Sequence, residues 1–106
     1  MVFGVEPASS PLINDKKAGP HKIQGIGANF VPKNYHADVI DEVLTITDEE
    51  AFDMVREIAA KEGILVGISA GANICAAKKL AEKYPGKKVV TVAPDGADKY
   101  MSMNIF

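Results

Sequence analysis

The sequence predicts an α/β fold built on a parallel sheet with helices on both faces. Three observations carry this prediction. Apolar segments of strand length recur along the 106 residues, and the later ones are apolar on both faces, as in a covered parallel sheet. Segments with apolar residues at helical spacing alternate with them. One long segment, residues 8–36, fits neither period, and a loop of this length in a small domain is often functional.

Four strands are expected, at residues 2–5, 43–46, 64–68 and 89–93. Each is rich in β-branched or other apolar residues and is followed by a proline, a capping residue or a run of small residues that stops it. Only two helices accompany these four strands, so part of the sheet would be bare or would pair with another chain.

The two helices have clear boundaries. Thr47 and Glu50 have the spacing of a capping box, in which each side chain accepts a hydrogen bond from the other residue's backbone N–H. The first helix begins there and is expected to end at Gly63. The second runs from Ser69 to about Lys83 and is lined with small apolar residues, so it is expected to be more deeply buried.

Composition excludes several classes of protein. The 12 basic and 14 acidic residues give a net charge of −2, which argues against a nucleic-acid binder. A single cysteine cannot make a disulfide framework or a cysteine-rich metal site. No apolar run could span a membrane, and the N-terminus lacks a secretory pattern. We expect one cytoplasmic domain, and 106 residues are few for an enzyme that binds a large organic cofactor.

Familiar catalytic patterns are largely missing. Residues 25–27 read Gly-Ile-Gly but lack the third glycine and the preceding strand of a dinucleotide fingerprint. His21 and His36 have no partner at metal-ligand spacing, so no metal site is expected. Cys75 lies among alanines on the expected buried face of a helix and is interpreted as an inert core thiol.

Ser69 is the most informative residue. It follows an apolar strand and opens a helix, at the carboxyl edge of the sheet where α/β folds bind ligands. Two interpretations remain open. Its hydroxyl either caps the helix or faces a ligand. No suitable histidine base accompanies it, so a nucleophile is not expected.

Four segments together resemble one family. They are residues 4–10, 21–28, 67–72 and 94–102, in that order. They are similar to the C-terminal third of the cysteine synthase (O-acetylserine sulfhydrylase) family, a group of fold type II pyridoxal-phosphate enzymes. The resemblance implies that residues 1–106 are a single partial domain, the C-terminal part of the larger, cofactor-binding domain, and that the length reflects truncation.

The resemblance also implies roles for five residues. Ser69 matches the serine whose hydroxyl bonds the pyridine nitrogen of pyridoxal 5'-phosphate. A neutral hydroxyl leaves that nitrogen largely unprotonated, which makes a weaker electron sink than a carboxylate would. Gly25 and Gly27 match the loop beside the bound amino acid, where the missing Cβ allows close approach. Pro94 and Asp95 match the turn near the same pyridine edge.

Other family parts have no match here. The Schiff-base lysine, the phosphate-binding loop and the substrate-carboxylate loop are absent, so we assign no catalytic residue. The implied reaction of the whole enzyme replaces the acetoxy group of O-acetyl-L-serine with sulfide by β-elimination and addition. The isolated chain is expected to be inactive.

Alternatives to this function remain. A cystathionine β-synthase-like enzyme shares the turn around Ser69, although residues 24–27 and 94–102 favour cysteine synthase. The chain is otherwise a non-catalytic fragment or interaction module. The resemblance further implies a homodimer, and a serine acetyltransferase whose C-terminal tail docks at the mouth of the active site.

Overall fold

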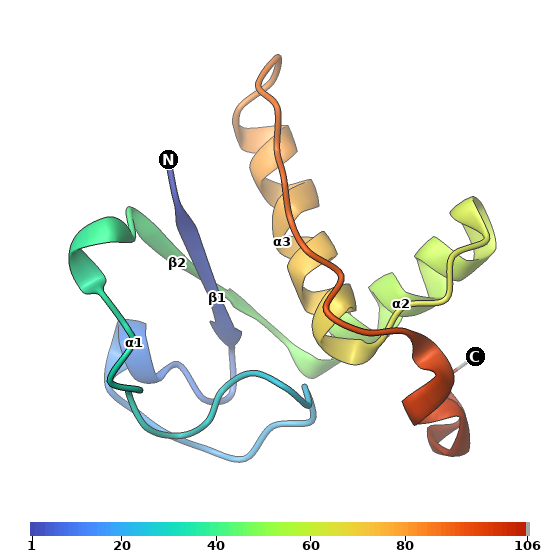
Figure 1. The fold of residues 1–106 in the computed structure, drawn as a ribbon, viewed down its shortest axis with the longest axis horizontal. Helices are drawn as coiled ribbons and strands as arrows, with labels where there is room; N and C mark the ends of the chain where they lie inside the picture. The colour runs from blue at the N-terminus through green and yellow to red at the C-terminus, as the bar shows by residue number, and fades with distance from the viewer. Residues whose placement is uncertain (106) are drawn as a thin grey trace.

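Two parallel strands form the sheet of this chain. The computed structural model describes residues 1–105, in which β1 (Phe3–Pro7) pairs with β2 (Glu42–Ile46) (Figure 1). Phe3 lies opposite Glu42 and Pro7 opposite Ile46, so both strands end at the same edge. The first two predicted strands, their parallel pairing and the α/β class are thus confirmed.

Helix α2 (Asp48–Glu62) begins at the predicted capping box. The Glu50 N–H donates to the Thr47 hydroxyl, and the Thr47 N–H donates to the Glu50 carboxylate, both over 3.0 Å. Gly63 ends the helix with a φ of 68°, a left-handed conformation that glycine adopts without cost. The predicted bounds of this helix are confirmed.

Helix α3 (Ile68–Lys83) packs against α2 and contacts both strands. The two helices meet closely at Gly71, where an added Cβ would lie 2.5 Å from the Ala51 carbonyl oxygen and 2.6 Å from Val55 Cγ2. The core of the chain lies around this contact and consists of Ile23, Ile46, Ala51, Met54, Val55, Val66, Ile68, Ala70, Ala72, Cys75, Ala76, Tyr100 and Ile105. Burial raises the pKa of the Cys75 thiol, in keeping with its interpretation as a core residue.

Two predicted strands, at residues 64–68 and 89–93, are wrong for this chain. Ile64 is 55% exposed and Val90 is 90% exposed. Val66 makes only an isolated antiparallel bridge, and Ile68 already belongs to α3. A strand requires a hydrogen-bonded neighbour, and no described residue lies beside these segments in a parallel ladder. Their apolar character suits a wider sheet than these residues alone can build.

The predicted long loop contains one short helix, α1 (Leu12–Asp15). The buried Glu6 carboxylate anchors it, since it accepts hydrogen bonds from the N–H groups of Ile13 and Asn14 over 2.8 and 3.0 Å. A 3₁₀ turn, η1 (Ala37–Val39), then leads into β2. The loop is therefore held to the carboxyl end of β1, where Glu6 lies.

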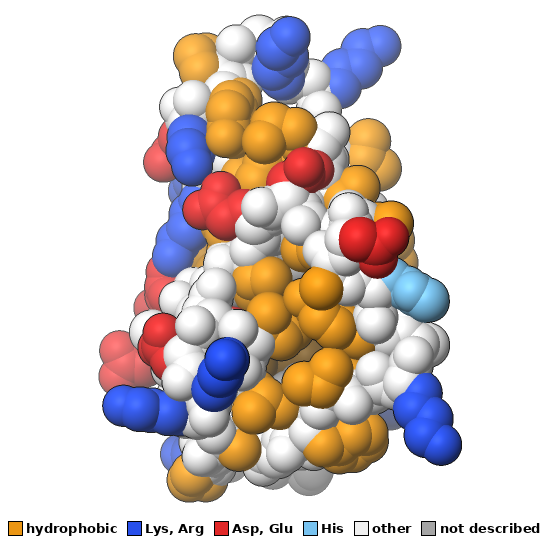
Figure 2. All heavy atoms as spheres, turned by 90° about the vertical axis from the view of Figure 1, so that its left-hand side faces the viewer, with side chains coloured by type: hydrophobic (Ala, Val, Ile, Leu, Met, Phe, Trp, Pro, Cys, Tyr) orange, Lys and Arg blue, Asp and Glu red, His pale blue; other side chains and the backbone are white. Residues whose placement is uncertain are grey.

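One side of the sheet remains open. The edge of β1 that does not face β2 carries no described strand, and a cavity of about 590 Å³ lies between β1, α3 and the extended chain at residues 87–91. Figure 2 shows hydrophobic side chains gathered in the centre of the face that carries β2 and α1, with acidic groups across its upper part and basic groups mostly around its margins. Within the described chain, no helix is long and apolar enough to cross a membrane.

Candidate cofactor site

Ser69 lies in the first turn of α3. Gly67 is the N-cap of the helix and supplies no side-chain cap, so the interpretation of Ser69 as a capping residue is wrong. Ser69 is only 4% exposed, and its hydroxyl lies next to Gly25. A hydroxyl in a largely buried residue needs a hydrogen-bond acceptor, so this position suits a ligand atom that accepts from it.

Gly25 lies directly beside this hydroxyl. A Cβ added to Gly25 would lie 3.5 Å from Ser69 Oγ, and the residue has a φ of 99° that side chains rarely adopt. Both facts favour glycine here, because it keeps the space in front of Ser69 open. The structure thus brings together two of the predicted site residues, which lie 44 positions apart in the sequence.

Gly27 holds the same loop in place from its other side. An added Cβ would lie 2.5 Å from His21 Nε2 and 2.6 Å from Pro7 Cγ. His21 Nδ1 accepts from the Ile23 N–H over 3.1 Å, so the ring carries its proton on Nε2, which donates to the Gly27 carbonyl over 2.7 Å. Gly27 therefore packs against the end of β1. His21 fixes the shape of the loop at residues 25–28, which we call the glycine loop.

The turn at Asp95 is tied to the start of α3. The Gly67 N–H donates to the Asp95 carbonyl over 3.0 Å, and Val66 bridges Gly96. The Asp95 side chain folds back against Gly67, where an added Cβ would overlap Oδ1 and approach Cγ to 2.7 Å. Pro94, by contrast, is exposed. The predicted turn thus reaches the helix end that carries Ser69.

Tyr100 is a site feature that the sequence did not reveal. It lies in the 3₁₀ segment η2 (Ala97–Met103), is 6% exposed, and donates its hydroxyl to Asp95 Oδ2 over 2.6 Å. This bond raises the pKa of Tyr100, so the hydroxyl stays protonated as the donor. Asp95 Oδ1 is buried and has no partner within the described chain. The only signal in the sequence was that Tyr100 belongs to the resembling segment 94–102.

Residues 67–71 also match the pattern Gly-x-Ser-x-Gly of a nucleophile elbow, which requires a histidine base. His21 uses both ring nitrogens on its own loop, and His36 is exposed. Neither bonds Ser69, so the serine lacks the base that a nucleophile needs. Across residues 1–105, no cluster of three His, Cys, Asp or Glu side chains could hold a metal ion.

The arrangement fits the edge of a heteroaromatic ring. A neutral hydroxyl donor at a helix N-terminus, an open backbone surface at Gly25 and a carboxylate oxygen of Asp95 with no partner among residues 1–105 lie around the start of α3. A second cavity, of about 500 Å³, lies beneath the glycine loop and is lined partly by Glu6, Gly25 and Gly27. The donor set suits a ring nitrogen that accepts a hydrogen bond.

Comparison with known proteins identifies the family of the chain. Residues 1–95 match the family described as pyridoxal-phosphate dependent enzyme, and the chain belongs to that family. More particularly, it is 50% identical over 105 residues to cysteine synthase B of Campylobacter jejuni, a match that covers 99% of this chain and 35% of that protein. The chain therefore spans about a third of the length of the curated relatives it matches.

Solved structures are similarly close. O-acetylserine sulfhydrylase isoform 3 from Entamoeba histolytica superposes with a TM-score of 0.95 at 41% identity, over 99% of this chain and 32% of that one. The O-acetylserine dependent cystathionine β-synthase from Helicobacter pylori gives a TM-score of 0.89 at 46% identity, over 98% of this chain and 34% of that one. Both likenesses support the fold and extend over almost the whole chain.

Proposed function

We propose that this chain forms the pyridine-side wall of the cofactor pocket in a pyridoxal-phosphate-dependent cysteine synthase. The single observation that carries the proposal is the position of Ser69, a residue only 4% exposed whose hydroxyl faces the open backbone at Gly25. The similarity to cysteine synthases along nearly the whole chain supports it. In this proposal the activity belongs to a full-length protein, in which this chain is combined with the segments that its relatives have and this chain does not span.

Each site residue has a binding role in this proposal. Ser69 donates its hydroxyl to the ring nitrogen and adds no charge there. Gly25 and Gly27 let the loop backbone approach the bound amino acid, and Pro94 and Asp95 close the same edge of the ring. The cofactor itself supplies an electron sink for the α-carbon of the amino acid. A neutral partner at the nitrogen keeps that sink moderate, which suits the loss of a good leaving group such as acetate.

The overall reaction converts O-acetyl-L-serine and hydrogen sulfide into L-cysteine and acetic acid. The bond between Cβ and the acetoxy oxygen breaks, and a bond between Cβ and sulfur replaces it. No residue of this chain is assigned to form the covalent link with the cofactor, because the family resemblance implies that this lysine belongs to an N-terminal segment with no match here. The isolated chain is accordingly inactive.

The open sheet supports a place within a larger domain. The free edge of β1 and the unpaired apolar segment 89–92 are where further strands of the full-length protein would pair. A homodimer in the cytoplasm, and docking of a serine acetyltransferase tail at the mouth of the site, belong to the same proposal. The glycine loop, exposed at Gly25 and Ala28, is the surface available for such docking.

The deciding experiment compares two sulfur-containing substrates that could react after O-acetylserine. The full-length protein is supplied with O-acetylserine and either sulfide or homocysteine, and the rates of cysteine and cystathionine formation are measured. We expect sulfide-dependent cysteine formation to be the faster reaction. Faster cystathionine formation would favour the second candidate function, a cystathionine β-synthase, which the similarity to the Helicobacter pylori enzyme supports.

A further inference from the structure

Tyr100 and Asp95 form a pair at the start of α3 that no binding role explains so far. The Tyr100 hydroxyl donates to Asp95 Oδ2 over 2.6 Å, while Oδ1 is buried with no partner among residues 1–105. A buried carboxylate oxygen without a donor is costly, and such groups in proteins usually serve a site. A function is therefore needed to explain the buried Asp95 Oδ1, which has no partner in the described chain.

The surroundings hold the Asp95 side chain in one orientation. Its backbone carbonyl accepts from the Gly67 N–H, and the carboxylate packs so closely on Gly67 that a Cβ there would overlap it. The ring of Tyr100 presses on the same glycine, since its Cε2 would lie 2.8 Å from that Cβ. Two contacts and one hydrogen bond thus fix the carboxylate against the turn that leads to Ser69.

Without the hydrogen bond from the Tyr100 hydroxyl, the Asp95 side chain would be free to rotate toward solvent. Asp95 is only half-buried, and its neighbour Pro94 is exposed, so water lies within reach of a rotated side chain. A charge-assisted hydrogen bond of this length is among the stronger contacts a carboxylate can make. The bond is therefore what keeps a negative charge beside the first turn of α3.

We propose that Tyr100 is a positioning residue that holds the Asp95 carboxylate at the pyridine edge of the cofactor site, where its charge tunes the ring opposite the neutral Ser69. This inference rests on the proposed function and extends it. Ser69 sets the direct hydrogen bond to the ring. The Asp95–Tyr100 pair sets the field around that bond, because a fixed charge in a partly dehydrated site acts more strongly than one in water.

The test uses three variants of the full-length protein: Tyr100→Phe, Asp95→Asn and the double variant. Tyr100→Phe removes only the hydroxyl and keeps the buried ring, and Asp95→Asn removes the charge and keeps an oxygen acceptor. We expect both to shift the absorption maximum of the bound cofactor in the same direction. We expect kcat to fall roughly tenfold with KM changed less than about twofold. The double variant should shift no further than the larger single change.

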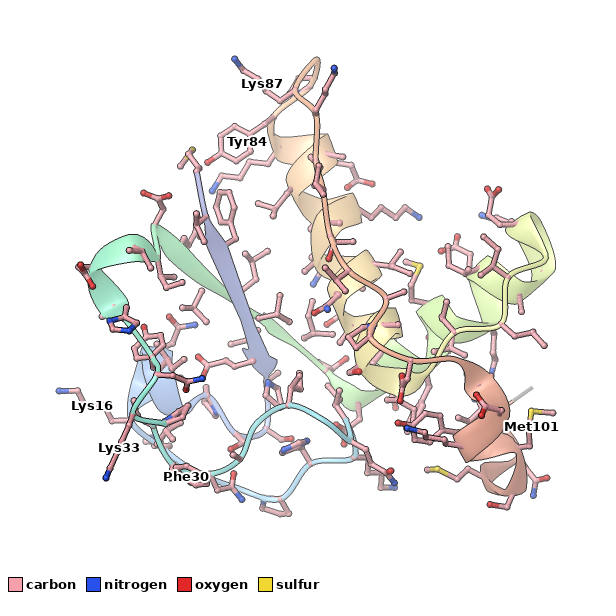
Figure 3. The ribbon with its side chains drawn as sticks, viewed as in Figure 1. Lys16, Phe30, Lys33, Tyr84, Lys87 and Met101 are labelled. Atoms are coloured by element: carbon pink, nitrogen blue, oxygen red, sulfur yellow. The ribbon has the colours of Figure 1, made fainter. Side chains whose placement is uncertain are left out.

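Tyr84→Phe is the matched control. Tyr84 lies at the other end of α3, where Figure 3 shows it far from η2 and Met101. It should leave the spectrum and kcat unchanged. Thermal unfolding of each variant shows whether a changed spectrum reflects loss of the folded structure or only a displaced Asp95 carboxylate.

Different results overturn different claims. A wild-type protein that binds no pyridoxal phosphate would contradict the proposed function itself. An active wild type whose Tyr100→Phe variant keeps the same spectrum and kcat would overturn the positioning role alone. Additive effects in the double variant would also overturn it, because they would mean that the two residues act separately. If Tyr100→Phe unfolds, the spectrum of Asp95→Asn decides: an unchanged spectrum contradicts the proposal.

Discussion

Gly67 and Asp95 are joined twice: the Gly67 N–H donates to the Asp95 carbonyl over 3.0 Å, and the Asp95 carboxylate turns back against the same glycine. This relationship ties the last turn of the candidate site to the start of α3. It also explains why residue 67 is glycine although its φ of −80° suits any residue. The space, and not the backbone conformation, excludes a side chain there.

Gly67→Ala should therefore destabilise the protein by about 1–3 kcal/mol, the usual cost of overpacking a closed site. Thermal or urea unfolding of the full-length protein measures the loss. The double variant Gly67→Ala, Asp95→Ala should recover part of it, because the overlapping carboxylate is gone. No recovery would mean that the Asp95 side chain is not the obstacle.

Gly63→Ala is the comparison variant for the backbone effect. A Cβ at Gly63 would meet no atom within 4 Å, but the residue has a φ of 68°, so this change measures only the roughly 1–2 kcal/mol cost of a left-handed backbone conformation.

Gly71→Ala sets two effects against each other. Alanine is better than glycine inside a helix by about 1 kcal/mol. At this position, however, the new Cβ would lie 2.5 Å from the Ala51 carbonyl oxygen, which belongs to helix backbone and cannot move freely. Overpacking should win, with a net loss of about 1–2 kcal/mol in the free energy of unfolding. The exposed change Lys78→Ala should stay within about 0.5 kcal/mol, and a Gly71→Ala protein more stable than wild type would contradict the close contact between α2 and α3.

Glu50 predicts a specific dependence of stability on acid. Burial would raise its pKa, but the hydrogen bonds and charge of Lys79 and the capping bonds of Thr47 outweigh that, so the pKa lies below its ordinary 4.5. A carboxylate with a lowered folded-state pKa contributes stability that is present above pH 4.5 and is lost as the pH falls through the folded-state value. Melting temperatures measured from pH 7 to pH 3 should fall less steeply for Glu50→Gln than for wild type. The exposed change Glu62→Gln is the control, and parallel curves for Glu50→Gln and wild type would contradict this role.

The strand predictions succeeded and failed for one physical reason. Residues 3–7 and 42–46 pair with each other through backbone hydrogen bonds and therefore form a sheet. Segments 64–68 and 89–93 have the same composition but no neighbour to bond, and composition alone does not reveal whether a partner exists. The capping box at Thr47 needed only local sequence, so the start of α2 was predictable to the residue.

The candidate site divides in the same way. The four resembling segments identified Ser69 and Gly25, and the structure places them side by side. That Gly67, and not Ser69, caps α3 follows from backbone geometry that the sequence pattern left open. The Asp95–Tyr100 bond depends on how η2 turns back, and no period or motif encodes that turn.

The isolated 106 residues should show no β-replacement activity. Mixed with pyridoxal phosphate, they should give no change in cofactor absorption on adding O-acetylserine beyond the change that the free cofactor shows with this amine. The free cofactor alone is the control. A band change that free pyridoxal phosphate does not show with O-acetylserine would mean that a lysine of this chain can hold the cofactor, contrary to the account.

The central claim, that Ser69 faces the ring nitrogen, is tested most directly by Ser69→Asp in the full-length protein. A carboxylate there stabilises a protonated ring, so the absorption of the bound cofactor should shift and turnover of O-acetylserine should fall at least about tenfold. Ser102→Ala, an exposed serine on η2, should change neither. An unchanged spectrum with unchanged turnover in Ser69→Asp would contradict the account.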